Sequence, residues 1–186
     1  MAKKNIGIQG FTLPMPQAIL GSRMDGRNNF MALAWVSRVN YNPSLMMISV
    51  GKRHFSNAAI KASGEFSVNI PSVDLVEVTD FVGLVSGSKL DKSELFDVDP
   101  GELENAPVIS KCPVSIECKV YDSMELPNDT LFVGEVVATW CDEDVLTDNM
   151  PDIKKVNPFT LTMPDNKYWA VGDCVGRAWH DGKKLK

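Results

Sequence analysis

The chain has 186 residues, a length that suits one hydrophobic core, and we treat residues 1–186 as a single domain. A composition of 44% hydrophobic and 23% charged residues is ordinary for a globular protein, and a net charge of −5 argues against non-specific binding to nucleic acid. The most apolar stretch, residues 45–50, is too short to span a membrane, and the first residues lack the apolar run of a signal peptide. We therefore expect a cytoplasmic protein that binds neither nucleic acid nor membranes.

Strand patterns dominate the chain. An Asp-Gly pair at residues 25–26 separates strands expected over residues 18–24 and 29–39, and this dipeptide suits the type I′ turn of a hairpin because it tolerates positive φ. Further strands are expected where apolar residues form short runs or alternate with polar ones, namely residues 45–50, 66–70, 114–121 and 131–140, with Gly134 as a candidate β-bulge.

Helical patterns are fewer and shorter. Ser56 is a candidate N-cap for a helix over residues 57–63, which Gly64 would end. Asp74 and Glu77 have the spacing of a capping box for a second helix. Apolar residues follow it at helical spacing: Leu75, Val78, Val82 and Val85.

The remaining segments and the overall count of elements indicate the fold class. Two acidic stretches, residues 91–104 and 142–152, are expected to form solvated loops. Many strands together with two or three short helices predict a mainly β protein, a single barrel with helical additions.

The cysteines and histidines form no metal-binding pattern. No two of the four cysteines make a CxxC motif, and neither His54 nor His180 is spaced with a cysteine, so we expect no metal site. Cys118 lies in an alternating strand pattern, which predicts a buried, unreactive thiol.

One segment has the features of an anion site. Gly51, Lys52, Arg53 and His54 follow a predicted strand, and Ser56 begins the predicted helix. Helix N-terminal amides favour anions, arginine can grip a phosphate through two N–H groups, and glycine allows close approach of a ligand. Basic loops before helices are also common surface features, so the pattern alone leaves both interpretations open. Neither a Walker motif nor a GxGxxG motif occurs.

A second segment, residues 29–37, combines large apolar residues with two small ones. Ala32 and Ala34 would leave room for a flat ring against a strand, although a tightly packed core strand has the same pattern. No spacing singles out a carboxylate pair or a nucleophile with its base, so we name no catalytic residue.

Across most of its length the sequence resembles the flavin reductase-like family, and within it the flavoredoxins. The resemblance rests on short motifs that are unspecific alone and specific as an ordered set. In the first part of the chain they are Leu20-Gly21-Ser22, Asp25-Gly26-Arg27, Asn29-x-Met31-x-x-Ala34-Trp35, Asn42-Pro43-Ser44, Ser49-Val50-Gly51-Lys52-Arg53 and Ser56-x-x-x-Ile60. Those that follow are Ser63-Gly64-Glu65-Phe66-x-Val68-Asn69, Gly83-x-x-Ser86-Gly87, Asp91-Lys92, Glu117-Cys118, Leu131-Phe132-Val133-Gly134-Glu135-Val136 and Tyr168-x-x-x-Gly172.

The resemblance implies a split β-barrel of Greek-key type that binds FMN without a covalent link, usually as a homodimer with flavin sites close to the subunit interface. It also implies which residues contact the cofactor. The isoalloxazine ring would lie along residues 29–37, with contacts from Asn29, Met31, Ala34, Trp35 and Ser37. The ribityl chain and phosphate would follow Ser49, Val50, Gly51, Lys52, Arg53, His54 and Ser56, with Ser86 and Lys92 also within reach.

One position departs from the family pattern. Many relatives carry a hydroxyl residue after the methionine of the Asn-x-Met motif, whereas this chain has Ala32. A side-chain hydrogen bond to the ring is not available there, so backbone N–H groups would have to replace it.

The resemblance leaves three functions open. The first is an electron carrier that keeps its FMN and exchanges electrons with a redox protein. The second is an NAD(P)H-dependent reductase that uses flavin as substrate, and the third is a non-redox binding module of the same fold. The sequence contains no nicotinamide-binding fingerprint that would identify an electron donor.

Overall fold

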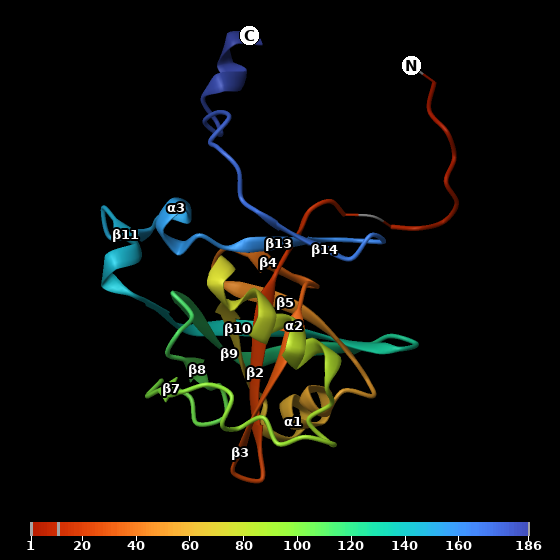
Figure 1. The fold of residues 1–186 in the computed structure, drawn as a ribbon, viewed down its shortest axis with the longest axis vertical. Helices are drawn as coiled ribbons and strands as arrows, with labels where there is room; N and C mark the ends of the chain where they lie inside the picture. The colour runs from red at the N-terminus through yellow and green to blue at the C-terminus, as the bar shows by residue number, and fades with distance from the viewer. Residues whose placement is uncertain (1, 11, 186) are drawn as a thin grey trace.

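The computed structural model describes residues 2–10 and 12–185, and its largest element is a seven-stranded antiparallel sheet (Figure 1). The strands lie in the order β3-β2-β6-β9-β10-β5-β4. Their bounds are β2 Ala18–Met24, β3 Arg27–Leu33, β4 Val36–Asn40, β5 Leu45–Gly51, β6 Glu65–Ile70, β9 Val114–Glu125 and β10 Asp129–Cys141. The prediction of a mainly β protein is confirmed.

The sheet curls on itself because its two edge strands follow one another in the chain. β3 and β4 lie at opposite ends of the strand order, yet only Ala34 and Trp35 connect them. A link of this length spans about 11 Å at most, so the two edges must come together. The result is a barrel that is split between β3 and β4. The single strand expected over residues 29–39 is therefore wrong, because its second half pairs with β5 instead of β2.

The hairpin turn at Asp25 and Gly26 has the geometry that the sequence predicts. Both residues adopt positive φ, 53° and 76°, and the turn pairs Met24 with Arg27. Two central residues with positive φ define a type I′ turn, whose twist matches that of the flanking strands.

Within residues 2–10 and 12–185, three α-helices accompany the sheet: α1 Phe55–Ser63, α2 Val76–Leu84 and α3 Ile153–Val156. α1 ends at Gly64, which is left-handed (φ 71°) as predicted, but its N-cap is His54, so the prediction of Ser56 as the cap is wrong. The His54 amide donates to the Gly51 carbonyl (3.0 Å), and this turn starts the helix earlier.

The predicted capping box before α2 does not form. Leu75 is the N-cap of α2, and it ends a 3-10 turn over Val73–Leu75. Asp74 accepts a hydrogen bond from the Ser72 hydroxyl, so it serves that turn and not α2. The helix ends before Val85, which is extended.

Short strands build the rest of the structure. β1 Met15–Pro16, β13 Phe159–Thr162 and β14 Lys167–Ala170 form a small sheet. Two pairs lie in or beside the acidic stretches, which are otherwise loops and 3-10 turns (Glu143–Val145 in the second): β7 Val98–Asp99 with β8 Val108–Ile109, and β11 Leu146–Thr147 with β12 Met150–Pro151. A last 3-10 turn spans Asp181–Leu185.

The barrel core centres on Phe66, which is fully buried among aliphatic residues and Phe132. Gly134 faces it so closely that a Cβ there would lie 2.5 Å from the ring of Phe66, and the register of β9 and β10 shifts beside Gly134, which confirms the predicted bulge. Cys118 is also fully buried, and burial raises the pKa of its thiol to about 12, as expected for an unreactive cysteine.

Over residues 2–10 and 12–185, no helix combines the length and the apolar character that crossing a membrane requires. The same residues contain no cluster of three histidine, cysteine or acidic side chains suited to a metal ion.

Candidate functional site

Three adjoining hollows surround His54, which lines all of them. The apolar pocket, about 210 Å³, is bounded by residues 31–35 with Ser49, Gly51, Asp129 and Met163. The polar pocket, about 80 Å³, includes Asn29, Phe55, Ser56, Ser86, Gly87 and Lys92 in its wall. The basic pocket, about 520 Å³, is bounded by residues 51–54 and the turn at residues 127–129. Segments distant in the chain thus meet around the N-terminus of α1.

The apolar pocket follows the break between β3 and β4. Ala32 and Ala34 contribute only methyl groups to its wall, and Trp35 is 53% exposed, so a flat face is available for stacking. The Ser49 amide donates to the Trp35 carbonyl (3.0 Å), which holds the connecting residues against β5. The pocket is therefore a shallow, mainly apolar slot with a fixed floor.

The two cations of the basic pocket, Lys52 and Arg53, differ in whether a carboxylate pairs with them. Lys52 lies 3.0 Å from the Glu125 carboxylate, which Lys61 also contacts at 2.7 Å. Hydrogen bonds from Lys61 and Lys52 lower the pKa of Glu125 to about 2, so this carboxylate stays ionised and compensates their charge. Arg53 has no carboxylate partner among the described residues. Glu125 thus offsets part of the charge that Lys52 brings to this pocket, whereas no carboxylate among the described residues offsets that of Arg53.

The start of α1 directly follows these two cations in the chain, and its N-cap lines the same pocket. His54 caps the helix with extended backbone (φ −77°, ψ 140°) and makes no side-chain cap hydrogen bond. The first amides of a helix have no partner inside it and carry the positive end of its dipole. Arg53 and this helix end therefore create one positive position.

The polar pocket contains a buried acceptor without a donor. Asn29 donates through Nδ2 to the Ser56 hydroxyl (2.8 Å), while its Oδ1 is buried and lacks a hydrogen-bond partner among the described residues. Buried polar atoms are nearly always satisfied, so an unsatisfied acceptor in a pocket wall indicates a place for a donor from a ligand.

Lys92 forms the other side of the polar pocket. The residue is 2% exposed, and its ammonium donates to the carbonyls of Phe30 and Val82, both at 2.8 Å. These bonds tie β3 to α2, and burial lowers the pKa of Lys92 to about 8. Because an ammonium has three donors, one remains for a group in the pocket.

Most of the residues that the sequence singles out meet in these pockets, and two do not. Ser37 lies on β4, is exposed, and donates to the neighbouring Arg38 carbonyl (3.2 Å). Val50 points into the barrel core, because side chains alternate along β5. Its carbonyl accepts from Asn57 (2.9 Å) and so helps to position α1.

Sequence reasoning did not single out Asp129 or Met163, which also line the apolar pocket. Asp129 pairs with Gly51 across the β10–β5 ladder, and Met163 comes from the turn between β13 and β14. For Asp129 the local signal is the turn pattern Pro127-Asn128-Asp129, and this pattern does not reveal which strand Asp129 faces.

The chain matches the model of the flavin reductase-like domain over residues 11–168, and it belongs to that family. Its fold is similar to the crystal structure of flavoredoxin from Methanosarcina acetivorans, with a TM-score of 0.98 and 47% identity over the whole of both chains. Flavoredoxin of Desulfovibrio vulgaris (Miyazaki F) has a TM-score of 0.90 and 32% identity, covering 97% of this chain and all of that one. A protein of Archaeoglobus fulgidus is 28% identical over 155 residues, which are 82% of this chain and 86% of the relative.

Proposed function

We propose that the three pockets together bind one FMN per chain without a covalent link, and that the protein transfers electrons through it. The observation that carries this proposal is the junction, at His54, of an apolar slot with a positive helix N-terminus. A flavin mononucleotide has the matching parts, a flat ring and a phosphate. Flavoredoxins among the similar structures, at 47% and 32% identity, support the same choice.

The residues present fit this cofactor. The unsatisfied Oδ1 of Asn29 offers an acceptor to a hydroxyl or ring N–H, and the charge of Arg53 lacks a partner in the described part of the chain. At Gly87 a Cβ would clash with Asn29, so the pocket keeps its depth only with glycine there.

In this proposal the apolar and the basic pocket have distinct tasks. Ala32, Ala34 and Trp35 hold the ring, with backbone N–H groups of this segment as its hydrogen-bond donors, because Ala32 has no hydroxyl. Arg53 and the first amides of α1 bind the phosphate. FMN supplies the redox chemistry, and the protein supplies position and electrostatics. No side chain is assigned as an acid or base.

Denaturing the purified protein is the direct test, and it is expected to release one flavin per chain that chromatographs as FMN. Release of FAD, or a colourless protein that FMN cannot reconstitute, would contradict the proposal.

Steady-state kinetics then distinguish an electron carrier from a flavin reductase. A carrier oxidises NADH or NADPH slowly and is reoxidised quickly by a redox protein, whereas turnover that saturates with free FMN would make the protein an NAD(P)H-dependent flavin reductase.

Gly87→Ala is expected to weaken FMN binding roughly three- to tenfold, a cost of about 1 kcal/mol that is typical of overpacking. The new methyl group would displace Asn29, which is buried and tied to Ser56 at 2.8 Å. Fluorescence titration of the apoprotein with FMN measures the change. Gly172→Ala is the control, because a Cβ there would meet open space. Equal affinity in both variants would remove the polar pocket from the binding site.

A further inference from the structure

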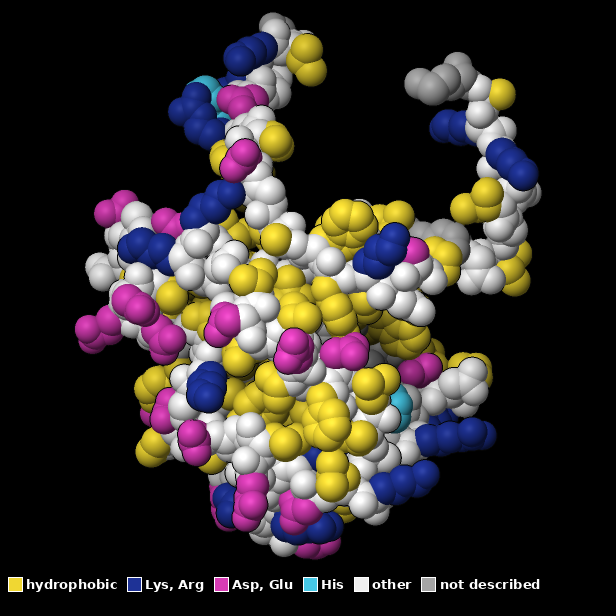
Figure 2. All heavy atoms as spheres, viewed as in Figure 1, with side chains coloured by type: hydrophobic (Ala, Val, Ile, Leu, Met, Phe, Trp, Pro, Cys, Tyr) yellow, Lys and Arg dark blue, Asp and Glu magenta, His cyan; other side chains and the backbone are white. Residues whose placement is uncertain are grey.

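One acidic side chain stands between two lysines beside the basic pocket. Glu125 lies at the end of β9, and its carboxylate oxygens contact Lys52 at 3.0 Å and Lys61 at 2.7 Å. Lys52 belongs to the wall of the basic pocket, whereas Glu125 does not. Figure 2 shows lysine and arginine side chains projecting on the side of the molecule toward which the turn between β9 and β10 points in Figure 1. The ion pair therefore draws the Lys52 ammonium to a carboxylate outside the pocket wall.

The β9–β10 hairpin holds Glu125 in this position. Glu125 pairs with Thr130 across the hairpin, and the hydroxyl of the buried Thr130 donates to its carboxylate (3.2 Å). The backbone of the pocket is tied to the same hairpin, because the Lys52 amide donates to the Asn128 carbonyl (2.9 Å). The hairpin thus fixes both the carboxylate and the start of the lysine side chain that reaches it.

The carboxylate changes the charge that a ligand in the pocket meets. Hydrogen bonds from Lys61 and Lys52 lower the pKa of Glu125 to about 2, so the carboxylate stays ionised throughout the neutral range. The three side chains are 37–54% exposed, and exposed ion pairs are weak. A phosphate can therefore take Lys52 from Glu125, but only by breaking this pair.

We propose that Glu125 limits the affinity of the basic pocket for a phosphate group by holding the Lys52 ammonium outside the pocket, and so sets how long the chain retains FMN. The statement about FMN rests on the proposed function. Glu125 is a positioning residue, since it acts on the phosphate through Lys52. Arg53 and the first amides of α1 form the permanent part of the phosphate site, and Lys52 forms the adjustable part.

Glu125→Gln tests this role, because it keeps the shape of the side chain and removes the charge that holds Lys52. At low ionic strength we expect the dissociation constant for FMN to fall about three- to tenfold and that for riboflavin to change less than about twofold. The rate of FMN release should fall with the first of these. Fluorescence titrations of the apoprotein measure both constants. Damage to the hairpin would weaken both ligands, so a selective gain for FMN identifies the charge effect.

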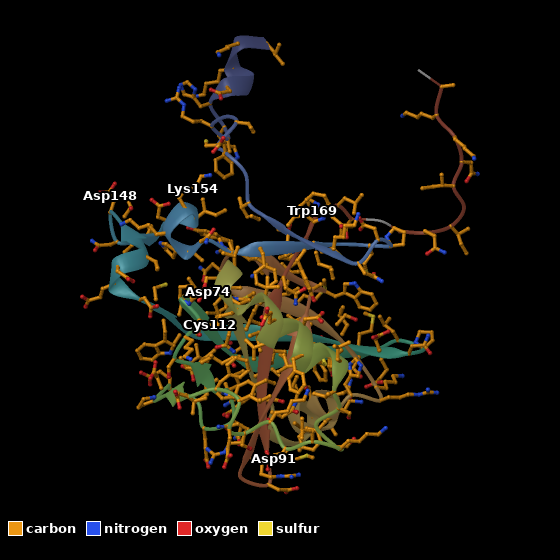
Figure 3. All side chains as sticks on the ribbon, viewed as in Figure 1. Asp74, Asp91, Cys112, Asp148, Lys154 and Trp169 are labelled. Atoms are coloured by element: carbon orange, nitrogen blue, oxygen red, sulfur yellow. The ribbon has the colours of Figure 1, made fainter. Side chains whose placement is uncertain are left out.

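Asp148→Asn is the matched control. It makes the same change from acid to amide, and Figure 3 shows Asp148 on the opposite side of the molecule from the turn between β9 and β10. The backbone of Asp148 is left-handed (φ 51°), a conformation that asparagine tolerates. Its FMN affinity should stay within about twofold of that of the unmodified protein. An equal gain in both variants would reduce the effect to net charge and overturn the role of Glu125.

A double-mutant cycle tests whether Glu125 acts through Lys52. Once Lys52 is replaced by alanine, Glu125→Gln should improve FMN binding less than about twofold. In a Lys61→Ala background the gain should persist, because Lys52 still contacts the other carboxylate oxygen. A full gain in the Lys52→Ala background would contradict the proposal, since Glu125 would then repel the phosphate without Lys52.

Inorganic phosphate separates this inference from the flavin proposal. Phosphate that binds the apoprotein raises its melting temperature by mass action, and Glu125→Gln should need about three- to tenfold less phosphate for the same shift. Equal phosphate requirements would overturn the role of Glu125, as would equal FMN affinities. A protein that shows the difference with phosphate but binds no flavin would contradict the proposed function while the role of Glu125 stands.

Discussion

Arg53→Ala is expected to weaken FMN binding about 10- to 150-fold at low ionic strength while leaving riboflavin binding nearly unchanged. A charge-assisted hydrogen bond to a phosphate contributes roughly 1.5–3 kcal/mol. Arg53 retains its full charge for such a contact because no carboxylate pairs with it in the described part of the chain. Riboflavin lacks the phosphate, so its binding measures everything except that contact. Parallel fluorescence titrations with the two ligands give the comparison.

Lys52 provides an internal comparison for this prediction. Glu125 already compensates its charge at 3.0 Å, so Lys52→Ala should weaken FMN binding less than Arg53→Ala. Both effects should shrink as salt is added, because exposed charges are screened. Arg23→Ala serves as the control, since Arg23 contacts the Glu104 carbonyl and lines none of the three pockets. Equal losses of FMN and riboflavin affinity in Arg53→Ala would place the phosphate elsewhere.

Phe66→Ala is expected to lower the free energy of unfolding by about 3–5 kcal/mol, the usual range for truncating a buried aromatic residue. The site has little capacity to collapse, because Gly134 faces the Phe66 ring and has no side chain that could move into the space. Urea unfolding of the apoprotein, followed by far-UV circular dichroism, measures the loss.

Two further variants keep this prediction testable if Phe66→Ala does not fold. Phe66→Leu should lose less than half as much stability, because most of the buried volume remains. Phe81→Ala on α2 should lose under about 1 kcal/mol, since that ring is 39% exposed. A loss in Phe66→Leu no greater than that in Phe81→Ala would show that the barrel does not depend on this contact.

Local sequence patterns were sufficient to predict much of the β structure. The type I′ turn at Asp25 and Gly26 follows from the conformations those two residues tolerate, and the strands over residues 66–70 and 114–121 follow from side-chain alternation. The bulge at Gly134 and the left-handed end of α1 at Gly64 also depend on the glycine at each of these positions. Each of these features is determined by near neighbours in the chain, so a single sequence contains the necessary information.

The positive segment after β5 was visible in the sequence, but its detailed chemistry was not. Lys52 and Arg53 look equivalent as neighbours in the chain. They differ in the structure because β10 pairs with β5 and brings Glu125, at the end of β9, beside Lys52 and not beside Arg53. The N-cap is His54 instead of the predicted Ser56 because the His54 amide forms a turn with the Gly51 carbonyl. This is a feature of backbone geometry that residue type does not encode.

The sequence by itself determined the mainly β class, the family pattern and the segments that carry the candidate site. Only the tertiary structure decided that residues 29–39 divide at Ala34 and Trp35 between two edge strands, because the residues of a continuous apolar run do not record which strand each half pairs with. It also decided that Val50 belongs to the core and that Asp129 and Met163 belong to the apolar pocket. Burial and pocket walls depend on strand register and sheet closure, which are properties of contacts between distant residues.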